Sequence, residues 1–217
     1  MPDPIKVVKK TTAATRPRTQ VEINRFRRLA LMEGTIESMA SHGVAATTVQ
    51  TITSAAGVSR GLIGHYFDNK EALIAEAFRH LFQEVGVILT AELGRRCGDD
   101  AAAQLAAFPE ILFSPAVFTP RNRNAFLSFW HEVRFNDLVR RANRELYRDY
   151  IDRMTQIVAA AAAAQGLEID ARETALGFIA LTDGLWLGLS IHDRLITAAQ
   201  ATDLCRSYLR DRKLLAD

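Results

Sequence analysis

Apolar residues recur at helical spacing along most of the chain. Between Glu22 and Gly43, Leu29, Met32 and Ile36 stand three or four residues apart, with charged side chains off that face. Such spacing places successive apolar side chains on one side of a helix, and glycine commonly ends the element. This segment is therefore predicted to form an amphipathic helix.

Two short helices are predicted next, the first ending at Ala56 and the second, of about two turns, capped by Ser59. For the first of them, Thr47 has capping-box spacing to Gln50, and Thr48 is an equally suitable N-cap. The remaining helices are placed at about 69–96, from 100 to a bend or stop at Pro109, and at 119–135, 137–164, 170–191 and 199–213. About nine helices and no clear strand predict an all-α fold.

Composition agrees with a helical, globular chain. The 217 residues include only 12 glycines and 6 prolines, and 48% of residues are hydrophobic. That content can bury the core of one domain, or of a small domain on a larger one. Residues 1–21 differ, because they contain Lys-Lys and Thr-Thr pairs and three prolines without periodicity. They are predicted to be a disordered basic arm.

Positive charge is concentrated near the N-terminus. Residues 1–30 hold eight of the 27 Lys and Arg residues but only two of the 25 acidic residues, a net charge of +6, which leaves −4 on the remainder. A basic end attached to a mildly acidic body suits contact with a polyanion such as DNA. An ordinary solvated tail is the alternative interpretation.

Cysteines and apolar runs bear on the compartment. Cys97 and Cys205 are far apart and form no CxxC pair, which favours free thiols in a reducing compartment. Residues 1–20 lack the apolar region of a signal peptide, and the apolar stretch 175–191 is short for a membrane span and interrupted by Asp183. We expect a cytoplasmic protein without a membrane partner, and no residue set indicates a metal ion or a cofactor.

Residues 47–73 are the most informative part of the sequence. A short helix, a break at Gly57 and a second short helix have the layout of a helix-turn-helix, whose second helix enters the major groove of DNA. A small residue, Ala55 or Ala56, is present where the first helix meets the turn. The apolar positions that would hold the helices together are Ile52, Val58, Leu62 and Ile63. The small or polar positions that would face the groove are Ser59, Arg60, Gly61, Gly64 and His65.

Gly61 and Gly64 are unusual in so short a helix. In a helix interior, each costs about 0.8–1 kcal/mol relative to alanine. Close approach of the helix to the DNA backbone is a physical reason for two glycines there. An ordinary pair of surface helices is the alternative.

The same residues carry a family resemblance. The order Gly57-Val58-Ser59-x-Gly61 and then His65-Tyr66-Phe67-x-x-Lys70-x-x-Leu73 resembles the signature of TetR-family transcriptional repressors. The resemblance implies an all-α homodimer, with an N-terminal three-helix helix-turn-helix DNA-binding domain over residues 22–68 and a larger ligand-binding and dimerisation domain over residues 69–214. It also implies that a small-molecule effector releases the repressor from double-stranded operator DNA.

The resemblance further assigns roles by position. The residues that match phosphate contacts of this family are Thr48, Ser59, Tyr66 and Lys70, and those that match its base-facing side are Arg60, Gly61 and His65. Phe67 is expected in the core, and Arg28 in the basic N-terminal segment is a further candidate DNA contact. A physical argument supports Lys70, because its ammonium joins a helix N-terminus that already attracts phosphate.

Residues 57–61 also match GxSxG, the nucleophile elbow of serine hydrolases. That elbow requires a strand-to-helix turn in a parallel sheet. Here the residues before Gly57 are predicted to end a helix. A helical enzyme is therefore the weaker interpretation, and we expect a protein without catalytic residues.

Aromatic residues gather on three predicted helices in the body of the chain. Three of them share one helix face at positions i, i+3 and i+4. Clustered aromatic faces bind quaternary ammonium groups, although aromatic residues at helical spacing more often form the core. The candidates are Phe126, Phe129, Trp130, Tyr147, Tyr150 and Trp186.

This region resembles the BetI branch of the TetR family. The resemblance rests on Phe126-Leu127-x-Phe129-Trp130 and Leu181-x-Asp183-Gly184-Leu185-Trp186-Leu187. BetI-type proteins repress genes for glycine betaine synthesis from choline, so the implied effector is choline or another cationic amine. There are two alternatives. One is a TetR-type regulator that responds to an unrelated ligand, and the other is a small-molecule-binding protein without operator function.

Asp183 is the acidic candidate of this region. It lies mid-helix among leucines, where an unpaired carboxylate is costly. It is expected to face a cationic ligand, to pair with an arginine or to cap a neighbouring helix. The same helix carries small residues that would let a partner helix approach at a dimer seam, namely Gly177, Ala180, Gly184 and Gly188.

Overall fold

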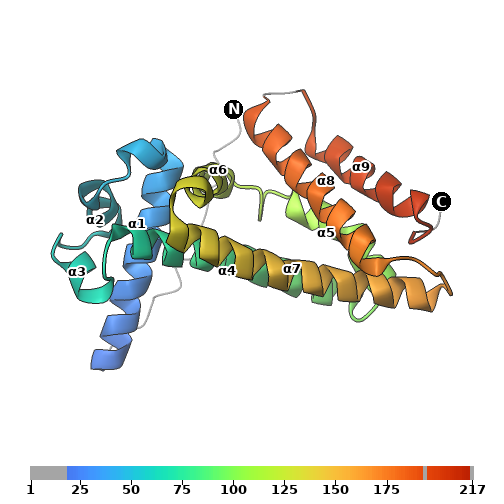
Figure 1. Ribbon diagram of the computed structural model, residues 1–217, viewed down its shortest axis with the longest axis horizontal. Coiled ribbons are helices and arrows are strands. Elements are labelled where there is room, and N and C mark those ends of the chain that lie inside the picture. The colour runs from blue at the N-terminus through green and yellow to red at the C-terminus, as the bar shows by residue number, and fades with distance from the viewer. Residues whose placement is uncertain (1–18, 193–194, 216–217) are drawn as a thin grey trace, which may run out of the picture.

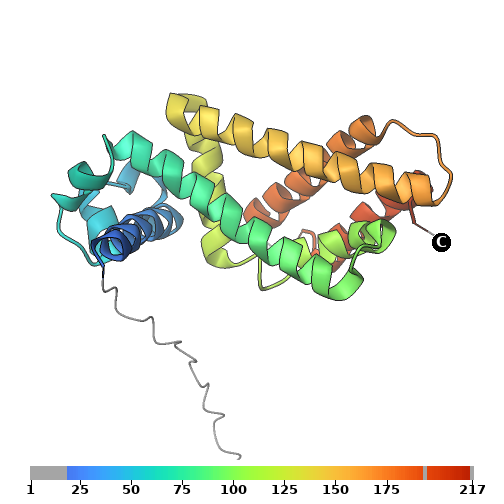
Figure 2. The same cartoon turned by 90° about the horizontal axis from the view of Figure 1, so that it is seen from below.

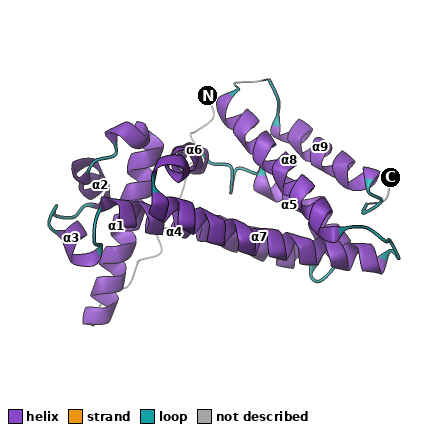
Figure 3. Cartoon of the chain, in the orientation of Figure 1, coloured by secondary structure: helices purple, strands orange, loops and turns teal. Residues whose placement is uncertain are grey.

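The computed structural model describes residues 19–192 and 195–215. Within those ranges it contains nine α-helices and no strand (Figure 3), so the predicted all-α fold is confirmed. The head consists of α1 (Gln20–Ala46), α2 (Val49–Ala56) and α3 (Leu62–Tyr66). The body consists of α4 (Lys70–Cys97), α5 (Ala101–Leu112), α6 (Pro120–Phe135), α7 (Asp137–Ala164), α8 (Ala171–Ile191) and α9 (Ala198–Asp211).

The first helix begins earlier than the sequence pattern indicated. Thr19 is its N-cap, and the side chains of Thr19 and Glu22 accept hydrogen bonds from each other's backbone N–H groups in a capping box. Residues 20 and 21, predicted to belong to the disordered arm, are therefore helical. The rest of the predicted arm, residues 1–18, lies outside the described part of the chain.

The connection between α1 and α2 resolves the choice of N-cap. Gly43 has a φ of 71° and interrupts the helical conformation where the end was predicted, although α1 continues to Ala46. Thr48 is the N-cap of α2, in a capping box with Thr51. Thr47 is instead buried, and its hydroxyl donates to the backbone carbonyl of Gly43 at 2.7 Å.

The third helix is shorter than predicted. Its N-cap is Gly61, with no side-chain hydrogen bond, so the predicted capping by Ser59 is wrong. The residues before it form a turn, in which the backbone carbonyl of Ser59 accepts from the N–H of Leu62 at 3.1 Å. Two glycines within six residues weaken helix propagation here, because glycine has a low helix propensity.

Side-chain caps fix the beginnings of the body helices. Each cap accepts a hydrogen bond from a backbone N–H in the first turn of its helix. Pro109 does not stop α5, which continues to Leu112, so the predicted stop is wrong, and the alternative of a bend stays a prediction. Burial of Phe108 and Ile111 on either side of the proline retains the helix. The capping residues lie at the helix starts that the sequence pattern predicted and are Asn69, Asp100, Thr119 and Asp170.

The long helices α4 and α7 extend from the head toward the far end of the molecule (Figure 1). They contact each other, and α5, α8 and α9 pack together at the end away from the head. Helix α6 contacts α1 of the head and both α7 and α8 of the body. The view from below shows α4 leaving the head as the start of the body (Figure 2). A change in the body can therefore reach the head through α4 and through α6.

Two groups of buried apolar residues stabilise the structure. The core of the head joins the first four helices and consists of Leu31, Ile52, Ile63, Phe67 and Leu73. Phe67 is thus a core residue, as predicted. The second group fills the body and includes Ile36 and Met39 of α1. Helix α1 therefore belongs to both cores and holds the head on the body.

Helix α8 is long and apolar enough to cross a membrane by length and composition alone. One side of it, with Phe178 and Trp186, is buried in the core of the body. The other side exposes Leu176, Leu187 and Ile191. Part of this apolar surface thus serves the core of the chain itself, and the remainder is exposed.

Candidate DNA interface and effector cavity

A close crossing of α1 and α2 shapes the head. A Cβ atom at Gly34 would lie 2.7 Å from both the Cβ and the backbone nitrogen of Ala56, and 2.7 Å from the carbonyl oxygen of Ile52. Only glycine fits there, because backbone atoms cannot move aside without displacing a helix. Sequence reasoning missed Gly34; a glycine inside an otherwise regular helical pattern was the available signal.

The turn and the third helix form the expected surface. Gly57 ends α2 in the left-handed conformation, with a φ of 65°. The side of the head formed by α3 and the turn before it is open to solvent. All of the residues predicted to face a DNA groove are exposed there, namely Ser59, Arg60, Gly61, Gly64 and His65.

The fold itself does not require glycine at positions 61 and 64. Neither residue has a positive φ. A Cβ atom added to Gly61 or to Gly64 would have nothing within 4 Å. No packing requirement within the described chain therefore competes with the explanation that these glycines allow close approach of a partner.

The predicted phosphate contacts lie at the edges of this surface. Thr48 is exposed at the N-cap of α2. The hydroxyl of Tyr66 donates to Oδ1 of Asn24 at 2.9 Å, and Nζ of Lys70 donates to the backbone carbonyl of Thr47 at 3.4 Å. These contacts hold Tyr66 and Lys70 against α1 and its connection to α2, and their contact with DNA stays a prediction.

Arg28 joins three helices of the structure. Its Nη1 donates to the backbone carbonyl of Tyr66 at 3.0 Å, and its guanidinium lies 4.5 Å from the ring centroid of Phe67. Its Nη2 lies 3.6 Å from Oε2 of Glu76. Sequence reasoning missed this structural role, because the first of these partners is 38 residues away along the chain. Contact of Arg28 with DNA stays a prediction.

The hydrolase interpretation is wrong. Ser59 follows helix α2 rather than a strand. The described part of the chain contains no sheet that could form the strand-to-helix turn of a nucleophile elbow. The GxSxG match is therefore coincidental.

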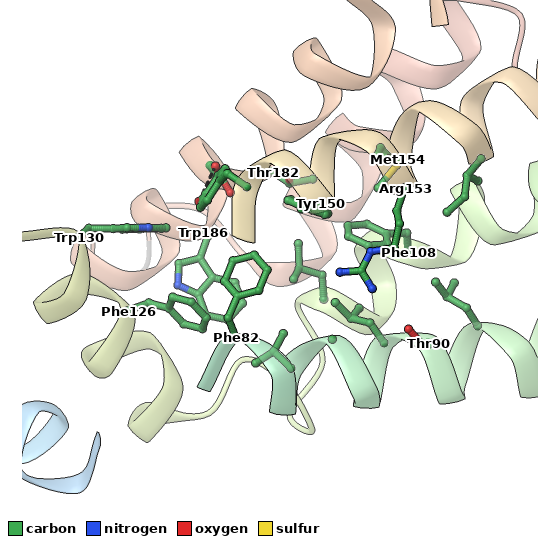
Figure 4. A pocket seen from close by; sticks show the side chains of 18 residues that line it. Phe82, Thr90, Phe108, Phe126, Trp130, Tyr150, Arg153, Met154, Thr182 and Trp186 are labelled. Carbon is green, nitrogen blue, oxygen red and sulfur yellow. Dashed lines mark hydrogen bonds between the residues drawn. The ribbon is translucent and has the colours of Figure 1, made fainter. Parts of the chain in front are cut away.

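The body contains an apolar cavity of about 140 Å³, formed by helices α4 to α8 (Figure 4). Phe129, one of the seven residues predicted to bind a ligand, is fully buried outside this lining and stacks on Phe78 with ring centroids 5.0 Å apart. The structure therefore assigns Phe129 to the core rather than to the cavity. The other six line the cavity and are Phe126, Trp130, Tyr147, Tyr150, Asp183 and Trp186.

Sequence reasoning missed part of the cavity wall. The ring of Phe82 in α4 lies 5.8 Å from that of Tyr147, and Phe108 of α5 stacks on Tyr150 at 6.4 Å between centroids. Arg153 of α7 also lines the cavity. Helical spacing places such residues on helices, but it does not indicate which faces of α4, α5 and α7 meet.

Asp183 and Tyr147 form the polar part of the wall. The hydroxyl of Tyr147 donates to Oδ2 of Asp183 at 3.0 Å. Burial raises the pKa of Asp183 to about 6, and the hydrogen bond from Tyr147 acts in the opposite direction. Burial and the nearby Asp183 also raise the pKa of Tyr147 and of Tyr150, so both phenols stay protonated. The described partner of Asp183 is thus a tyrosine, and the predicted arginine pair or helix cap is wrong.

Trp186 brings an unsatisfied donor to the cavity. Its side chain is 5% exposed, and its Nε1 has no hydrogen-bond partner among the described residues. The rings of Phe118 and Phe126 meet it edge-on at 4.7 and 5.5 Å. Because a buried donor without an acceptor is costly, a ligand group that accepts a hydrogen bond can stabilise this site.

The small residues of α8 do not form one continuous seam. Gly177 is covered by the ring of Tyr208 in α9, and Gly188 lies against the α8–α9 connection. At these two positions the close approach occurs within the chain, which corrects the predicted seam. Ala180 and Gly184 are exposed.

A charged cluster joins the head to the body. Arg121, near the start of α6, pairs with Glu33 of α1, and its Nη1 lies 3.5 Å from Oε2 of Glu84 in α4. Nε2 of His80 lies 2.7 Å from Oε1 of Glu33. The three residues Glu33, His80 and Glu84 lie close enough to hold a metal ion. Because Arg121 already pairs with both carboxylates, an ion-pair network describes the cluster better.

Fold and site together define a class of protein. An exposed helix-turn-helix on a small helical head, joined to a larger helical body, is the architecture of a DNA-binding transcriptional regulator. The chain belongs to the BetI-type branch of the TetR family of transcriptional repressors, because residues 101–212 match the C-terminal domain of BetI-type transcriptional repressors and residues 31–77 match the domain of tetR-family bacterial regulatory proteins. The resemblance seen in the sequence is thereby confirmed.

Related proteins agree with this assignment. The HTH-type transcriptional regulator BetI of Serratia proteamaculans (strain 568) is 27% identical over 194 residues, which cover 88% of this chain and 94% of that protein. A transcriptional regulator from Pseudomonas aeruginosa PAO1 has a similar crystal structure, with a TM-score of 0.77, 30% identity and coverage of 89% and 92%. A regulator from Saccharomonospora viridis, solved in complex with choline, shares the fold with a TM-score of 0.72, 22% identity and coverage of 84% and 95%.

Proposed function

We propose that the protein is a homodimeric, cytoplasmic repressor that a compact cationic amine of the choline type releases from operator DNA. The observation that carries the effector class is the cavity, which combines aromatic rings with the ionisable carboxylate of Asp183. Aromatic faces attract quaternary ammonium groups. Its volume of about 140 Å³ suits a small molecule, since an apolar cavity of about 150 Å³ accommodates benzene.

Choline is the first effector to test. The BetI names of the relatives and the choline complex of the Saccharomonospora viridis regulator support this choice. The genes under control are then those that convert choline to glycine betaine. The unsatisfied Nε1 of Trp186 suits the hydroxyl of such a ligand, because a hydroxyl oxygen accepts hydrogen bonds.

The DNA side of the proposal rests on the exposed face of α3. In it, the third helix enters the major groove, with Arg60, Gly61 and His65 toward the bases. Phosphate contacts position the head and make its affinity sensitive to salt. They come from Thr48, Ser59, Tyr66 and Lys70, with Arg28 as a further candidate.

The exposed apolar side of α8 supports the homodimer. Leu176, Leu187 and Ile191 of this helix and Leu204 of α9 are exposed in the single chain. Large apolar side chains grouped on neighbouring helices mark an interface more often than a solvated surface. A two-fold pair of such chains places two heads on successive major grooves, about 34 Å apart.

Effector binding acts on the spacing of the heads. Phe82 of α4 and Phe126 of α6 both line the cavity, and both helices contact α1 of the head. An effector that fits better when either helix is displaced favours the state in which the heads no longer match the operator. The effector can shift this equilibrium only through its different affinity for the two states.

A gel-shift titration tests the proposal. Full-length protein is titrated at fixed salt onto DNA from immediately upstream of its own gene, with random DNA of the same length as control and with and without choline. We expect operator binding that choline weakens, and we expect Arg60→Ala to reduce the preference for operator over random DNA by about 1–3 kcal/mol. Operator binding that choline does not weaken would support the DNA-binding regulator but show that choline is not its effector. Binding to the upstream DNA no stronger than to random DNA would show that this DNA does not contain the operator.

The cavity is tested separately. Trp130→Ala and Trp186→Ala should each weaken the response to choline while leaving the affinity for DNA unchanged, because both residues line the cavity in the body. Normal responses in both variants would show that the aromatic cavity is not the effector site.

A further inference from the structure

The cavity carries side chains of opposite charge. Asp183 of α8 and Arg153 of α7 both line it. Among the lining residues that the structure describes, they are the only acidic and the only positively charged side chain. Figure 4 shows Arg153 extending from α7 toward α4, the helix that contributes Thr90 to the same lining.

The two charges belong to different ends of the cavity. Asp183 is tied to Tyr147 on α7 by a hydrogen bond, and Arg153 lies six residues further along that helix. At 1.5 Å per residue, this separates the two positions on α7 by about 9 Å. Tyr150 lies midway between them on α7, and its ring, stacked on Phe108, lines the cavity.

Arg153 is exposed to solvent as well as lining the cavity, and it has no acidic partner among the described residues. Its described polar contact is within its own helix, from Nε to the backbone carbonyl of Asp149 at 3.4 Å. The nearby acids face other arginines: Asp149 lies 3.8 Å from Arg148, and Asp152 lies 3.6 Å from Arg172. An exposed guanidinium that lines the cavity and is not engaged by a carboxylate can receive a planar or phosphate anion, which it binds through two parallel hydrogen bonds.

We propose that the effector is a zwitterion, in which an ammonium group at Asp183 and the aromatic rings is joined by a short chain to an anionic group at Arg153. This inference rests on the proposed function and narrows it from cationic amines in general. Choline ends in a neutral hydroxyl and leaves Arg153 without a charged partner. A carboxylate and a phosphate both have the required chemistry, and the choice between them is left to measurement.

Isothermal titration calorimetry with the full-length protein tests the inference. Choline, phosphocholine and γ-butyrobetaine share a trimethylammonium group and differ at the other end, which is a hydroxyl, a phosphate and a carboxylate respectively. The titrations are done at pH 8, above the pKa of about 6 of Asp183, so that its carboxylate is ionised. We expect at least one of the two zwitterions to bind at least about tenfold more tightly than choline, and the better one identifies the anionic group.

Two variants separate the charge from the fold. Arg153→Gln keeps a polar side chain and removes its charge, and we expect it to abolish the preference for the zwitterion over choline. Arg148→Gln, on the same helix but outside the cavity lining, is the matched control and should retain the preference.

The outcomes distinguish this inference from the proposed function. Choline binding without a preference for either zwitterion overturns the zwitterion and leaves the cationic-amine effector in place. A preference that survives Arg153→Gln overturns the placement of the anionic group at Arg153. If none of the three compounds binds, the cationic-amine class is rejected and the zwitterion with it.

Discussion

The hydroxyl of Tyr147 donates a 3.0 Å hydrogen bond to Oδ2 of Asp183, and this bond joins α7 to α8 at the wall of the cavity. Burial raises the pKa of the Asp183 carboxyl to about 6, whereas the bond from Tyr147 lowers it. The charge of the wall therefore changes within an accessible range of pH, and with it the attraction for a cation.

Cation binding should strengthen as the pH rises through about 6. Below this value the carboxyl of Asp183 is neutral, and above it the carboxylate attracts the ammonium group. We expect the affinity for choline, measured by calorimetry, to rise roughly tenfold between pH 5 and pH 7.5, which corresponds to about 1.4 kcal/mol. Asp183→Asn should bind weakly at both values. An affinity of the unmodified protein that does not change with pH would contradict the role of Asp183.

The same residue should limit stability at neutral pH. The native pKa of about 6 lies above the ordinary value of 3.8, so the native state holds this proton more tightly than the unfolded state. This tighter binding of the proton stabilises the native state fully below about pH 3.8, and the stabilisation is lost as the pH rises through about 6. Asp183→Asn avoids the buried charge and should raise the free energy of unfolding at pH 8 by about 1–2 kcal/mol. Urea unfolding of both proteins at pH 4 and pH 8 measures the difference in the free energy of unfolding. A gain for Asp183→Asn at pH 4 alone would contradict the predicted cost of the buried charge.

Much of the fold could be predicted because its signals are local. Helical spacing and the capping residues placed nearly all helices, as Asn69 and Asp170 illustrate. The errors occurred where packing outweighed a local rule: α5 continues past Pro109 because its neighbours are buried. At α3, two glycines left a helix shorter than the pattern suggested.

The site could be predicted only in part, because it is built from contacts between helices. The aromatic residues of α6 and α7 were identified, but helical spacing could not separate Phe129, which packs in the core, from Phe126, which lines the cavity. Phe82 and Phe108 enter the wall only when α4 and α5 pack against α7. The partner of Asp183 likewise lies 36 residues away on another helix.

Gly34→Ala should destabilise the head by about 1–3 kcal/mol, because the added methyl group would overlap α2. Ala56→Gly should not fully rescue it, since the backbone nitrogen of residue 56 and the carbonyl oxygen of Ile52 remain 2.7 Å away. Thermal unfolding measures the loss of stability, and gel shifts measure whether DNA binding by the head is also lost. Gly94→Ala in α4 is the matched control, because a Cβ atom there has nothing within 4 Å. Equal stability of the Gly34→Ala and Gly94→Ala variants would contradict the close crossing of α1 and α2.

Gly64→Ala should separate stability from DNA binding. The added methyl group has open space, and replacing glycine within a helix gains up to about 1 kcal/mol. If the recognition helix approaches the DNA backbone closely, the same methyl group should weaken operator binding by roughly tenfold or more, or about 1.4 kcal/mol. Unchanged binding to operator DNA would show that the glycine does not serve contact with DNA.

Helix α6 links the cavity to the head. It brings Phe126 to the cavity. It is also hydrogen-bonded to α1 of the head: Nδ2 of Asn124 donates to the carbonyl of Ala40 at 3.3 Å, and Oγ of Ser128 donates to the carbonyl of Met39 at 3.1 Å. The ion pair of Arg121 with Glu33 adds a charged connection between α6 and α1. The side chain of Arg121 is 30% exposed, so its loss should weaken this connection without unfolding the protein.

Arg121→Gln should therefore reduce the coupling between effector and DNA rather than either binding event alone. We expect the affinities for effector and for operator, each measured without the other, to change by less than about twofold. The weakening of operator binding by effector should fall roughly fivefold, because a coupling free energy of about 1 kcal/mol corresponds to that factor. Arg148→Gln, which removes a surface ion pair with Asp149 within α7, is the control and should leave the coupling unchanged. Full release by effector in Arg121→Gln would show that α4 transmits the signal without this connection.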